Sequence, residues 1–229
     1  MNELHNNTAI LVFSRSAEAE SHEKRLAFDA RKAAPVVQLM IDHTRRIAQS
    51  TELPYFFLTE KQQVGSSFGQ RLKNAFDTIF AKGFTNVIAI GNDCLTLSKT
   101  DLLNATHALN AGTNAVFGRT SDGGAYIIGL QKIAFDALDF QKINWQTPSV
   151  FDAFLSLSTE KSLKTLCLTE KTDIDSLEQW VNILNTLPLS LKKTFLHLLA
   201  FAKTVFSTEI QTLTLGFTPV SGLLRAPPF

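Results

Sequence analysis

The segment Asn86-Val87-Ile88-Ala89-Ile90-Gly91-Asn92-Asp93 decides the fold of this chain of 229 residues. Its apolar run, from Val87 to Ile90, predicts a strand that is buried on both faces. Strands of this kind are typical of parallel sheets with helices on both sides. Ligands of such sheets bind beyond the carboxyl ends of the strands, and Asp93 follows this strand directly. Asp93 is therefore the first candidate for a functional residue.

The same pattern extends along the chain in both directions. Apolar runs predict strands at 9–13, 54–58, 86–90, 115–117, 125–128 and 163–168, and apolar residues at helical spacing predict helices at 36–48, 68–82, 99–111 and 175–187. The polar, charged stretch 14–32 is expected to be a loop. Strands alternating with helices predict an α/β fold, a three-layer α/β/α sandwich with a mostly parallel central sheet.

Two parts of the chain are expected to differ in organisation. Residues 1–188 are predicted to form one domain, and residues 189–229 an apolar helix followed by an irregular tail rich in glycine and proline. The helix can pack on the domain, form a homodimer contact, or lie on a membrane surface. The sequence does not distinguish these three arrangements.

Composition excludes several classes of protein. The chain is 45% hydrophobic and 19% charged, which fits a globular protein with a sizeable core. Lys plus Arg is 22 and Asp plus Glu is 21, so no basic excess favours a nucleic acid partner. Two isolated cysteines, no signal-like N-terminus and no run of about 18 apolar residues predict a cytoplasmic protein without a transmembrane segment.

Two aspartates are the first candidates for chemistry. Asp93 at a strand end could bind a divalent cation that neutralises a nucleotide diphosphate, or it could only bond its own turn. Asp122 precedes Gly123 and Gly124, whose backbone N–H groups could approach a ligand closely. Asp122 could be a metal ligand or a base, or this segment could be a plain hairpin turn. If both aspartates meet at one opening, a shared site is favoured.

Further candidates could bind a ligand. Gly65, Ser67, Gly69 and Arg71 open a helix whose free N–H groups could meet an anion, although Ser67 could simply cap the helix. Arg15 and Arg25 could hold phosphate or lie in a solvated loop. Trp145 could stack on a sugar or belong to the core. Asp173, just before the predicted helix cap Asp175, could reach the cavity.

Several motifs in order resemble a known bacterial family. They are Gly-x-x-x-Gly-x-Arg-Leu at 65–72, Ile-Gly-x-Asp at 90–93, Asp-Gly-Gly-x-Tyr-x-x-Gly-Leu at 122–130, Trp-x-Thr-Pro at 145–148 and Asp-x-Asp at 173–175. The chain is similar over 8–187 to the glycosyltransferase-A-like (GT-A) family of mostly uncharacterised transferases associated with radical-enzyme gene clusters. The resemblance implies a nucleotide-diphospho-sugar transferase fold.

The resemblance also implies roles for residues. Arg15 and Arg25 would hold nucleotide phosphates, the glycine loop from Gly65 to Arg71 would lie near the base, and Asp93 would bind Mg²⁺ or Mn²⁺. Asp173 is a second candidate metal ligand. Many relatives carry Pro-x-x-Gly-x-x-Lys-Thr-Arg-Leu where this chain has Ala17 to Leu26, with Glu23 at the lysine position. A glutamate there repels phosphate.

Three functions follow from these observations. The first is a metal-dependent transferase that uses a nucleotide-diphosphate-activated sugar donor, with Asp93 and Asp122 as catalytic residues. The second is a nucleotidyltransferase acting on a small phosphorylated acid. The third is a non-catalytic binding protein that kept the fold. In each case the partner is a nucleotide or nucleotide-sugar.

Overall fold

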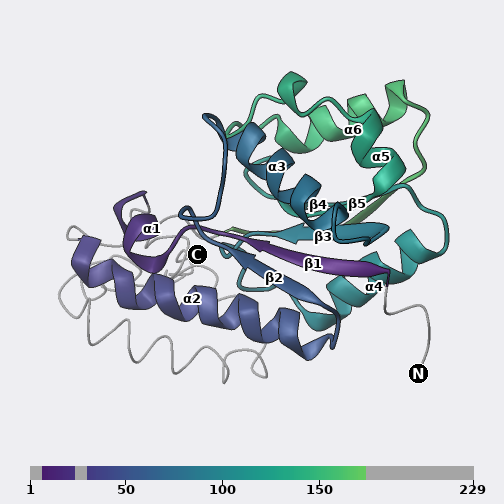
Figure 1. The fold of residues 1–229 in the computed structure, drawn as a ribbon. Coiled ribbons are helices and arrows are strands. Elements are labelled where there is room, and N and C mark those ends of the chain that lie inside the picture. The colour runs from purple at the N-terminus through teal and green to yellow at the C-terminus, as the bar shows by residue number, and fades with distance from the viewer. Residues whose placement is uncertain (1–6, 24–29, 174–229) are drawn as a thin grey trace, which may run out of the picture.

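In the computed structural model, the structure describes residues 7–23 and 30–173 (Figure 1). The strands are β1 (Thr8–Phe13), β2 (Tyr55–Leu58), β3 (Asn86–Ile90), β4 (Ala115–Thr120), β5 (Ala125–Gln131) and β6 (Thr165–Lys171). The helices are α1 (Ala17–Glu23), α2 (Ala30–Ser50), α3 (Phe68–Phe80), α4 (Lys99–Asn110), α5 (Lys132–Ala137), α6 (Val150–Glu160) and the short 3-10 helix η2 (Phe140–Lys142).

The strands form one mixed, mostly parallel sheet of six strands in the order β2-β1-β3-β5-β4-β6. Strand β5 runs antiparallel to both of its neighbours, β3 and β4, and every other pairing is parallel. Strands β1, β2, β3, β4 and β6 therefore end at the same edge of the sheet. The predicted fold class is confirmed, and this edge is where ligands are expected.

Helices cover both faces of the sheet (Figure 1). Helices α3, α5 and α6 pack on one face, and α2 and α4 on the other. The strands supply alternating side chains to the two layers, as the two-residue period of a strand requires. In β3, Val87 and Ala89 join the core beneath α3, whereas Ile88 and Ile90 join the core beneath α4. This double burial explains the continuous apolar run seen in the sequence.

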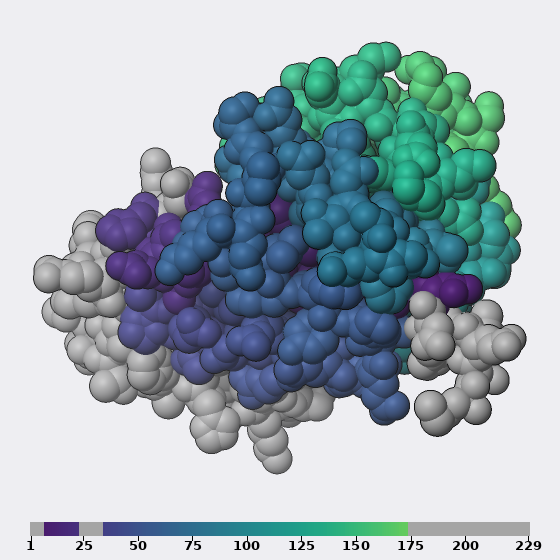
Figure 2. Space-filling model, viewed as in Figure 1, coloured from purple at the N-terminus to yellow at the C-terminus, as the bar shows by residue number. Residues whose placement is uncertain are grey.

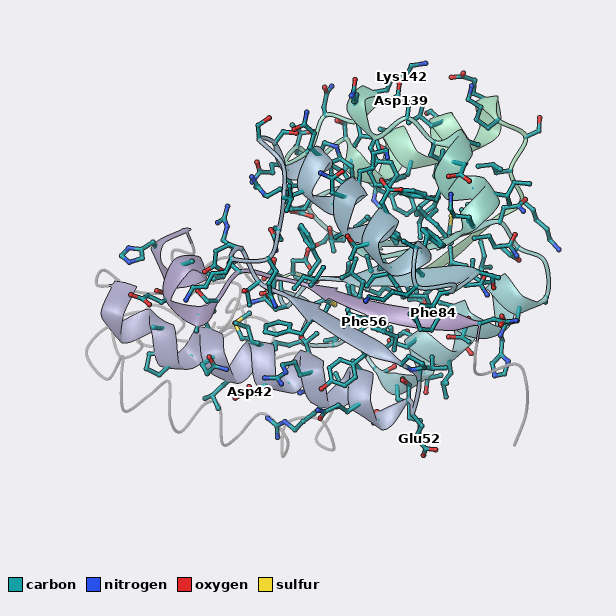
Figure 3. All side chains as sticks on the ribbon, viewed as in Figure 1. Asp42, Glu52, Phe56, Phe84, Asp139 and Lys142 are labelled. Carbon is teal, nitrogen blue, oxygen red and sulfur yellow. The ribbon has the colours of Figure 1, made fainter. Side chains whose placement is uncertain are left out.

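The apolar run 54–58 predicts a strand buried on both faces, and this prediction was wrong because β2 is an edge strand. All four of its residues are half-buried, because β2 has a neighbour on one side only. Phe56 lies beside Phe84 at this side of the sheet (Figure 3), with the two ring centroids 5.7 Å apart. The edge is therefore partly covered by side chains.

The stretch predicted to be a loop contains helix α1, which is a second correction. The hydroxyl of Ser16 accepts a hydrogen bond from the N–H of Ala19 at 3.3 Å and so caps this helix. Strands β4 and β5 run three residues further than predicted, and β6 begins two residues later. The predicted helix at 175–187, the cap Asp175 and the separate tail at 189–229 lie outside the described residues.

Candidate active site

A cavity of about 530 Å³ opens at the edge where the parallel strands end. Asp93, Asp122 and Asp173 all line it, although they come from three separate segments of the chain. Arg15 and Arg71 line it as well. Asp93 and Asp122, which are distant in the sequence, therefore lie at one opening, as the predicted site requires.

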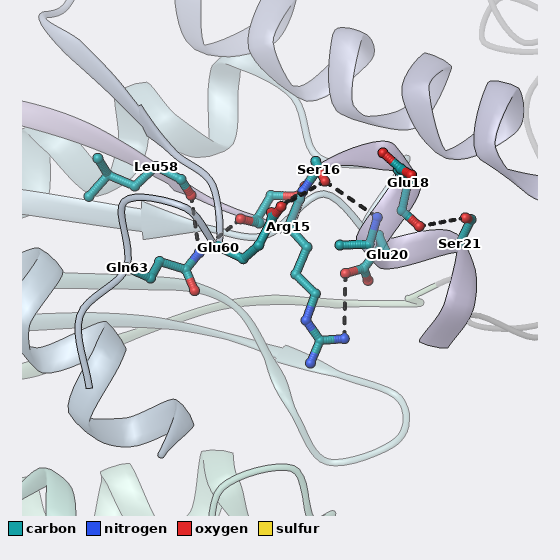
Figure 4. Close-up of polar contacts among 10 residues, drawn as sticks. Arg15, Ser16, Glu18, Glu20, Ser21, Leu58, Glu60 and Gln63 are labelled. Atoms are coloured by element: carbon teal, nitrogen blue, oxygen red, sulfur yellow. Dashed lines mark hydrogen bonds and ion pairs between the residues drawn. The ribbon is translucent and has the colours of Figure 1, made fainter. Parts of the chain in front are cut away.

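The segment after β1, which includes α1, carries an ion pair at this cavity (Figure 4). A guanidinium nitrogen of Arg15 lies 3.9 Å from a carboxylate oxygen of Glu20, and both residues line the cavity. Glu60, after β2, accepts hydrogen bonds from the backbone N–H of Ser16 at 2.6 Å and from its hydroxyl at 2.9 Å. A loop expected to hold phosphate thus already contacts two carboxylates of the chain itself.

The side-chain amide of Gln63 also joins the carboxyl ends of β1 and β2. The side-chain N–H₂ group of Gln63 donates to the carbonyl oxygens of Ser14 at 2.8 Å and Leu58 at 3.1 Å (Figure 4). In the space-filling view, α1 and the segment before α3 lie against each other on one side of the molecule (Figure 2). Burial raises the pKa of Glu60, but the two hydrogen bonds from Ser16, a bond from the backbone of Glu60 itself and the charge of Lys61 together leave this pKa below its ordinary value.

Asp93 and Asp173 lie close to the same short loop. Asp93 is half-buried, and its Oδ1 atom is buried. Burial, followed by the negative charge of Asp173, raises the pKa of the neighbouring Cys94 thiol to about 12. Asp93 and Asp173 line the same cavity.

Lys171 ties the end of β6 to this loop. Its ammonium group donates to the carbonyl oxygen of Thr96 at 3.0 Å and lies 3.1 Å from the carboxylate of Asp101. The side chains of Lys171 and Asp101 are each 16% exposed, so water screens the pair less than a surface pair. Asp173 follows Lys171 by two residues, and this contact therefore helps to place it.

The two cysteines are expected to react differently with a thiol reagent. Cys94 is buried, and its raised pKa leaves almost no thiolate at pH 8, whereas Cys167 is exposed. We expect one thiol to react rapidly in the native protein and the second only in denaturant, as measured by titration with a chromogenic disulfide. Rapid reaction of both thiols in the native protein would contradict the described environment of Cys94.

The Asp122 turn is a hairpin turn that also faces the cavity. Oδ1 of Asp122 accepts hydrogen bonds from the Thr120 hydroxyl at 2.5 Å and from the N–H of Gly124 at 3.0 Å. Gly123 has a φ of +90°, which favours glycine, and its carbonyl accepts from the N–H of Phe151 at 3.1 Å. The plain alternative, a turn, is thus correct, and the exposed carboxylate of Asp122 still lines the cavity.

Trp145 belongs to the core and to the cavity wall at once. Its indole N–H donates to the carbonyl of Phe140 at 2.8 Å, and its ring lies 5.2 Å from Phe68 and 5.6 Å from Phe154 between centroids. The alternative that Trp145 belongs to the core is therefore correct, but it does not exclude contact with a ligand. The ring also lines the cavity, where a sugar or a base could contact it.

Of the four candidates Gly65, Ser67, Gly69 and Arg71, only Arg71, in the first turn of α3, lines the cavity. Ser67 is the cap of α3 and accepts from the N–H of Gln70 at 3.2 Å. Gly65 has a φ of +141°, and Gly69 leaves room for the indole of Trp145, since a Cβ there would lie 2.2 Å from its nitrogen. Gly65, Ser67 and Gly69 thus shape the wall without lining it.

Two further sequence candidates need a separate statement. Gly123 does not line the cavity, although its neighbour Gly124 does. Arg25 lies outside the described residues. Their predicted roles in nucleotide binding stay predictions.

Sequence reasoning missed several residues that the structure brings to or near the cavity. They are Glu20, Glu60, Gln63, Asn92 and Lys171. Only Asn92 carried a signal, because it sits in the segment 86–93 between the strand and Asp93. The others depend on where loops fold back, which residue spacing does not reveal.

The carboxylates of the cavity are of the type that binds a divalent cation when a substrate supplies the other ligands. In the described ranges, no group of three or more His, Cys, Asp and Glu side chains could hold a metal ion. Mg²⁺ needs only one or two carboxylates when phosphate oxygens and water complete its shell. Asp93 and Asp173 line the cavity and could supply these carboxylates.

The comparisons with known proteins agree with the fold. A model of the family described as "Uncharacterized protein conserved in bacteria (DUF2064)" matches residues 17–147, more than half of the chain. The crystal structure of a proposed nucleotide-diphospho-sugar transferase from Desulfovibrio desulfuricans is similar with a TM-score of 0.70 at 19% identity, over 87% of this chain and 98% of that one. At this identity the likeness shows the fold alone.

Two more solved structures are more distant. Rv0371c from Mycobacterium tuberculosis, crystallised with manganese, has a TM-score of 0.47 at 11% identity, over 80% of this chain and 100% of that one. The 4-diphosphocytidyl-2C-methyl-D-erythritol synthase from Anaerococcus prevotii has a TM-score of 0.48 at 9% identity, over 78% and 96% of the two chains. Both are too distant to bear on function. No curated protein matches the sequence significantly.

Among residues 7–23 and 30–173, no helix combines the length and the apolar character needed to cross a bilayer.

Proposed function

We propose that this chain, which belongs to the DUF2064 family, is a metal-dependent transferase that takes a sugar from a nucleotide-diphosphate-activated donor. One observation carries the proposal. Three aspartates and two arginines from five segments line a single cavity at the carboxyl edge of the sheet: Arg15, Arg71, Asp93, Asp122 and Asp173. A bound cation would be stabilised by the aspartates, and an anionic ligand by the arginines, which explains why both charges gather in one cavity.

Asp93 and Asp173 would hold the cation. A bound Mg²⁺ or Mn²⁺ would neutralise the charge that develops on the leaving diphosphate. Arg15 and Arg71 would bind phosphate oxygens from the other walls of the cavity. Asp122, which is exposed and held by its turn, would accept the proton of the acceptor hydroxyl. The indole of Trp145 would cover one face of the sugar.

Binding of a nucleotide panel tests this function. We expect the full chain to bind at least one nucleoside diphosphate or nucleotide-sugar in the presence of Mn²⁺, as measured by isothermal titration calorimetry. Chelation of the cation is expected to weaken this binding by on the order of 100-fold, because two phosphates would then face three carboxylates without screening. Equal affinity with and without Mn²⁺ would contradict a metal-dependent site.

A second candidate is a binding protein that does not catalyse transfer. The ion pair of Arg15 with Glu20 and the bonds of Glu60 to Ser16 favour it, because these carboxylates oppose phosphate at the loop after β1. Binding without turnover of any bound nucleotide-sugar would support this function. The remaining function, nucleotidyl transfer to a small phosphorylated acid, needs a triphosphate to bind more tightly than the corresponding diphosphate.

A further inference from the structure

Asn92 is a buried polar residue with an unsatisfied amide at the cavity. Its exposed fraction is 3%, and it lines the same cavity as Asp93. The Nδ2 atom is buried and donates no hydrogen bond to any atom in the described part of the chain. A buried N–H₂ group without an acceptor destabilises a folded protein, and most such groups in proteins are paired.

The other end of the same strand provides a direct comparison. Asn86, at the start of β3, is also 3% exposed. Its Nδ2 atom donates to the hydroxyl of Thr8 at 3.1 Å and to the side-chain oxygen of Asn110 at 2.8 Å. Asn86 begins β3 and Asn92 follows its end, and of these two equally buried asparagines only Asn86 has its amide paired within the described part of the chain.

We propose that Asn92 recognises the ligand by donating a hydrogen bond to a phosphate oxygen of a bound nucleoside diphosphate. The inference deepens the proposed function and rests on it. Phosphate oxygens only accept hydrogen bonds, and an amide donor can be buried at lower cost than a charged one. Asn92 lines the cavity and its side chain makes no hydrogen bond within the described part of the chain, so rotation about its last side-chain torsion can turn Nδ2 toward the cavity without breaking one.

Position favours a phosphate oxygen over other acceptors. Asn92 directly precedes Asp93, the residue proposed to share a cation with the diphosphate. A phosphate group bound to that cation would lie within reach of Asn92, the preceding residue in the same loop. The carboxylates of the cavity cannot contribute this donor, because ionised carboxylates only accept.

The replacement of Asn92 by alanine separates recognition from folding. For Asn92→Ala we expect a melting temperature without ligand that is unchanged or higher by about 2–4 °C, since an unpaired buried amide is removed. We expect the affinity for a nucleoside diphosphate with Mn²⁺ to fall about 10- to 100-fold. The matched control Asn86→Ala should melt at a lower temperature, because it leaves the Thr8 hydroxyl without its donor.

Three outcomes would overturn the inference. The first is a loss of stability in Asn92→Ala as large as that in Asn86→Ala, which would make Asn92 structural. The second is unchanged affinity in Asn92→Ala while the wild type binds, which would leave the proposed function intact. The third is tighter Mn²⁺ binding in Asn92→Asp, which would make position 92 a cation ligand; we expect that variant to bind diphosphate at least as weakly as the alanine variant. If the wild type binds no nucleoside diphosphate, the proposed function fails, and this inference fails with it.

Discussion

Replacement of Asp93 by alanine is expected to weaken Mn²⁺-dependent nucleotide binding by on the order of 100-fold or more. Asp93 is the proposed cation ligand at the end of β3, and its Oδ1 atom is buried in the wall of the cavity. Removal of the carboxylate takes away both a charge and a ligand. Calorimetric titration of the variant with the nucleotide that the wild type binds would measure the loss.

The same substitution should leave the stability of the protein nearly unchanged. Asp93, Asp122 and Asp173 line one cavity, and removal of one carboxylate relieves repulsion among them. The control is Asp136→Ala, an exposed aspartate on α5 that pairs with Lys132. We expect the control to bind as the wild type does. Wild-type affinity in Asp93→Ala would remove Asp93 from the site, and a large drop in its melting temperature would make its role structural.

Replacement of Gly123 by alanine is expected to lower the free energy of unfolding by about 2–4 kcal/mol. Gly123 has a φ of +90°, and a Cβ atom there would lie 1.9 Å from the carbonyl oxygen of Pro148. Backbone has to move to relieve such a contact. Pro148 lines the cavity together with Trp145, so the movement would widen the cavity as well as destabilise the fold.

Gly83 provides the matched control for this strain. Its φ is +94°, and no atom lies within 4 Å of the position of a Cβ. Gly83→Ala should therefore cost only the conformational penalty of about 1 kcal/mol. Urea denaturation of both variants measures the difference, which isolates the contact with Pro148. Equal destabilisation of the two variants would show that this contact has no energetic weight.

The fold could be predicted because its signal is local. Each residue from Val87 to Ile90 is apolar, and in the structure each one packs into one of the two cores. Helix α1 was missed because its cap depends on the single hydroxyl of Ser16 within a highly charged stretch. Strand β2 looked buried because apolar composition does not reveal whether a strand has one neighbour or two.

The site was predictable only in part, for a similar reason. Asp93 and Asp122 could be placed at one opening because strand ends in such a fold meet at one edge. The contacts of Glu60 with Ser16 join residues 44 positions apart, and no spacing rule relates them. The unpaired amide of Asn92 is invisible in the sequence, since Asn86 has the same residue type and the same burial.

The reversed direction of β5 has a consequence for how related proteins could diverge. Because β5 runs against β3 and β4, a hairpin of a few residues, rather than a long crossover, delivers Asp122 to the edge of the sheet. An insertion at this hairpin would extend one rim of the binding chamber while the pairing of all six strands stayed intact. Homologues that accept bulkier acceptor molecules would then differ in length at 121–124 before they differ anywhere in the sheet.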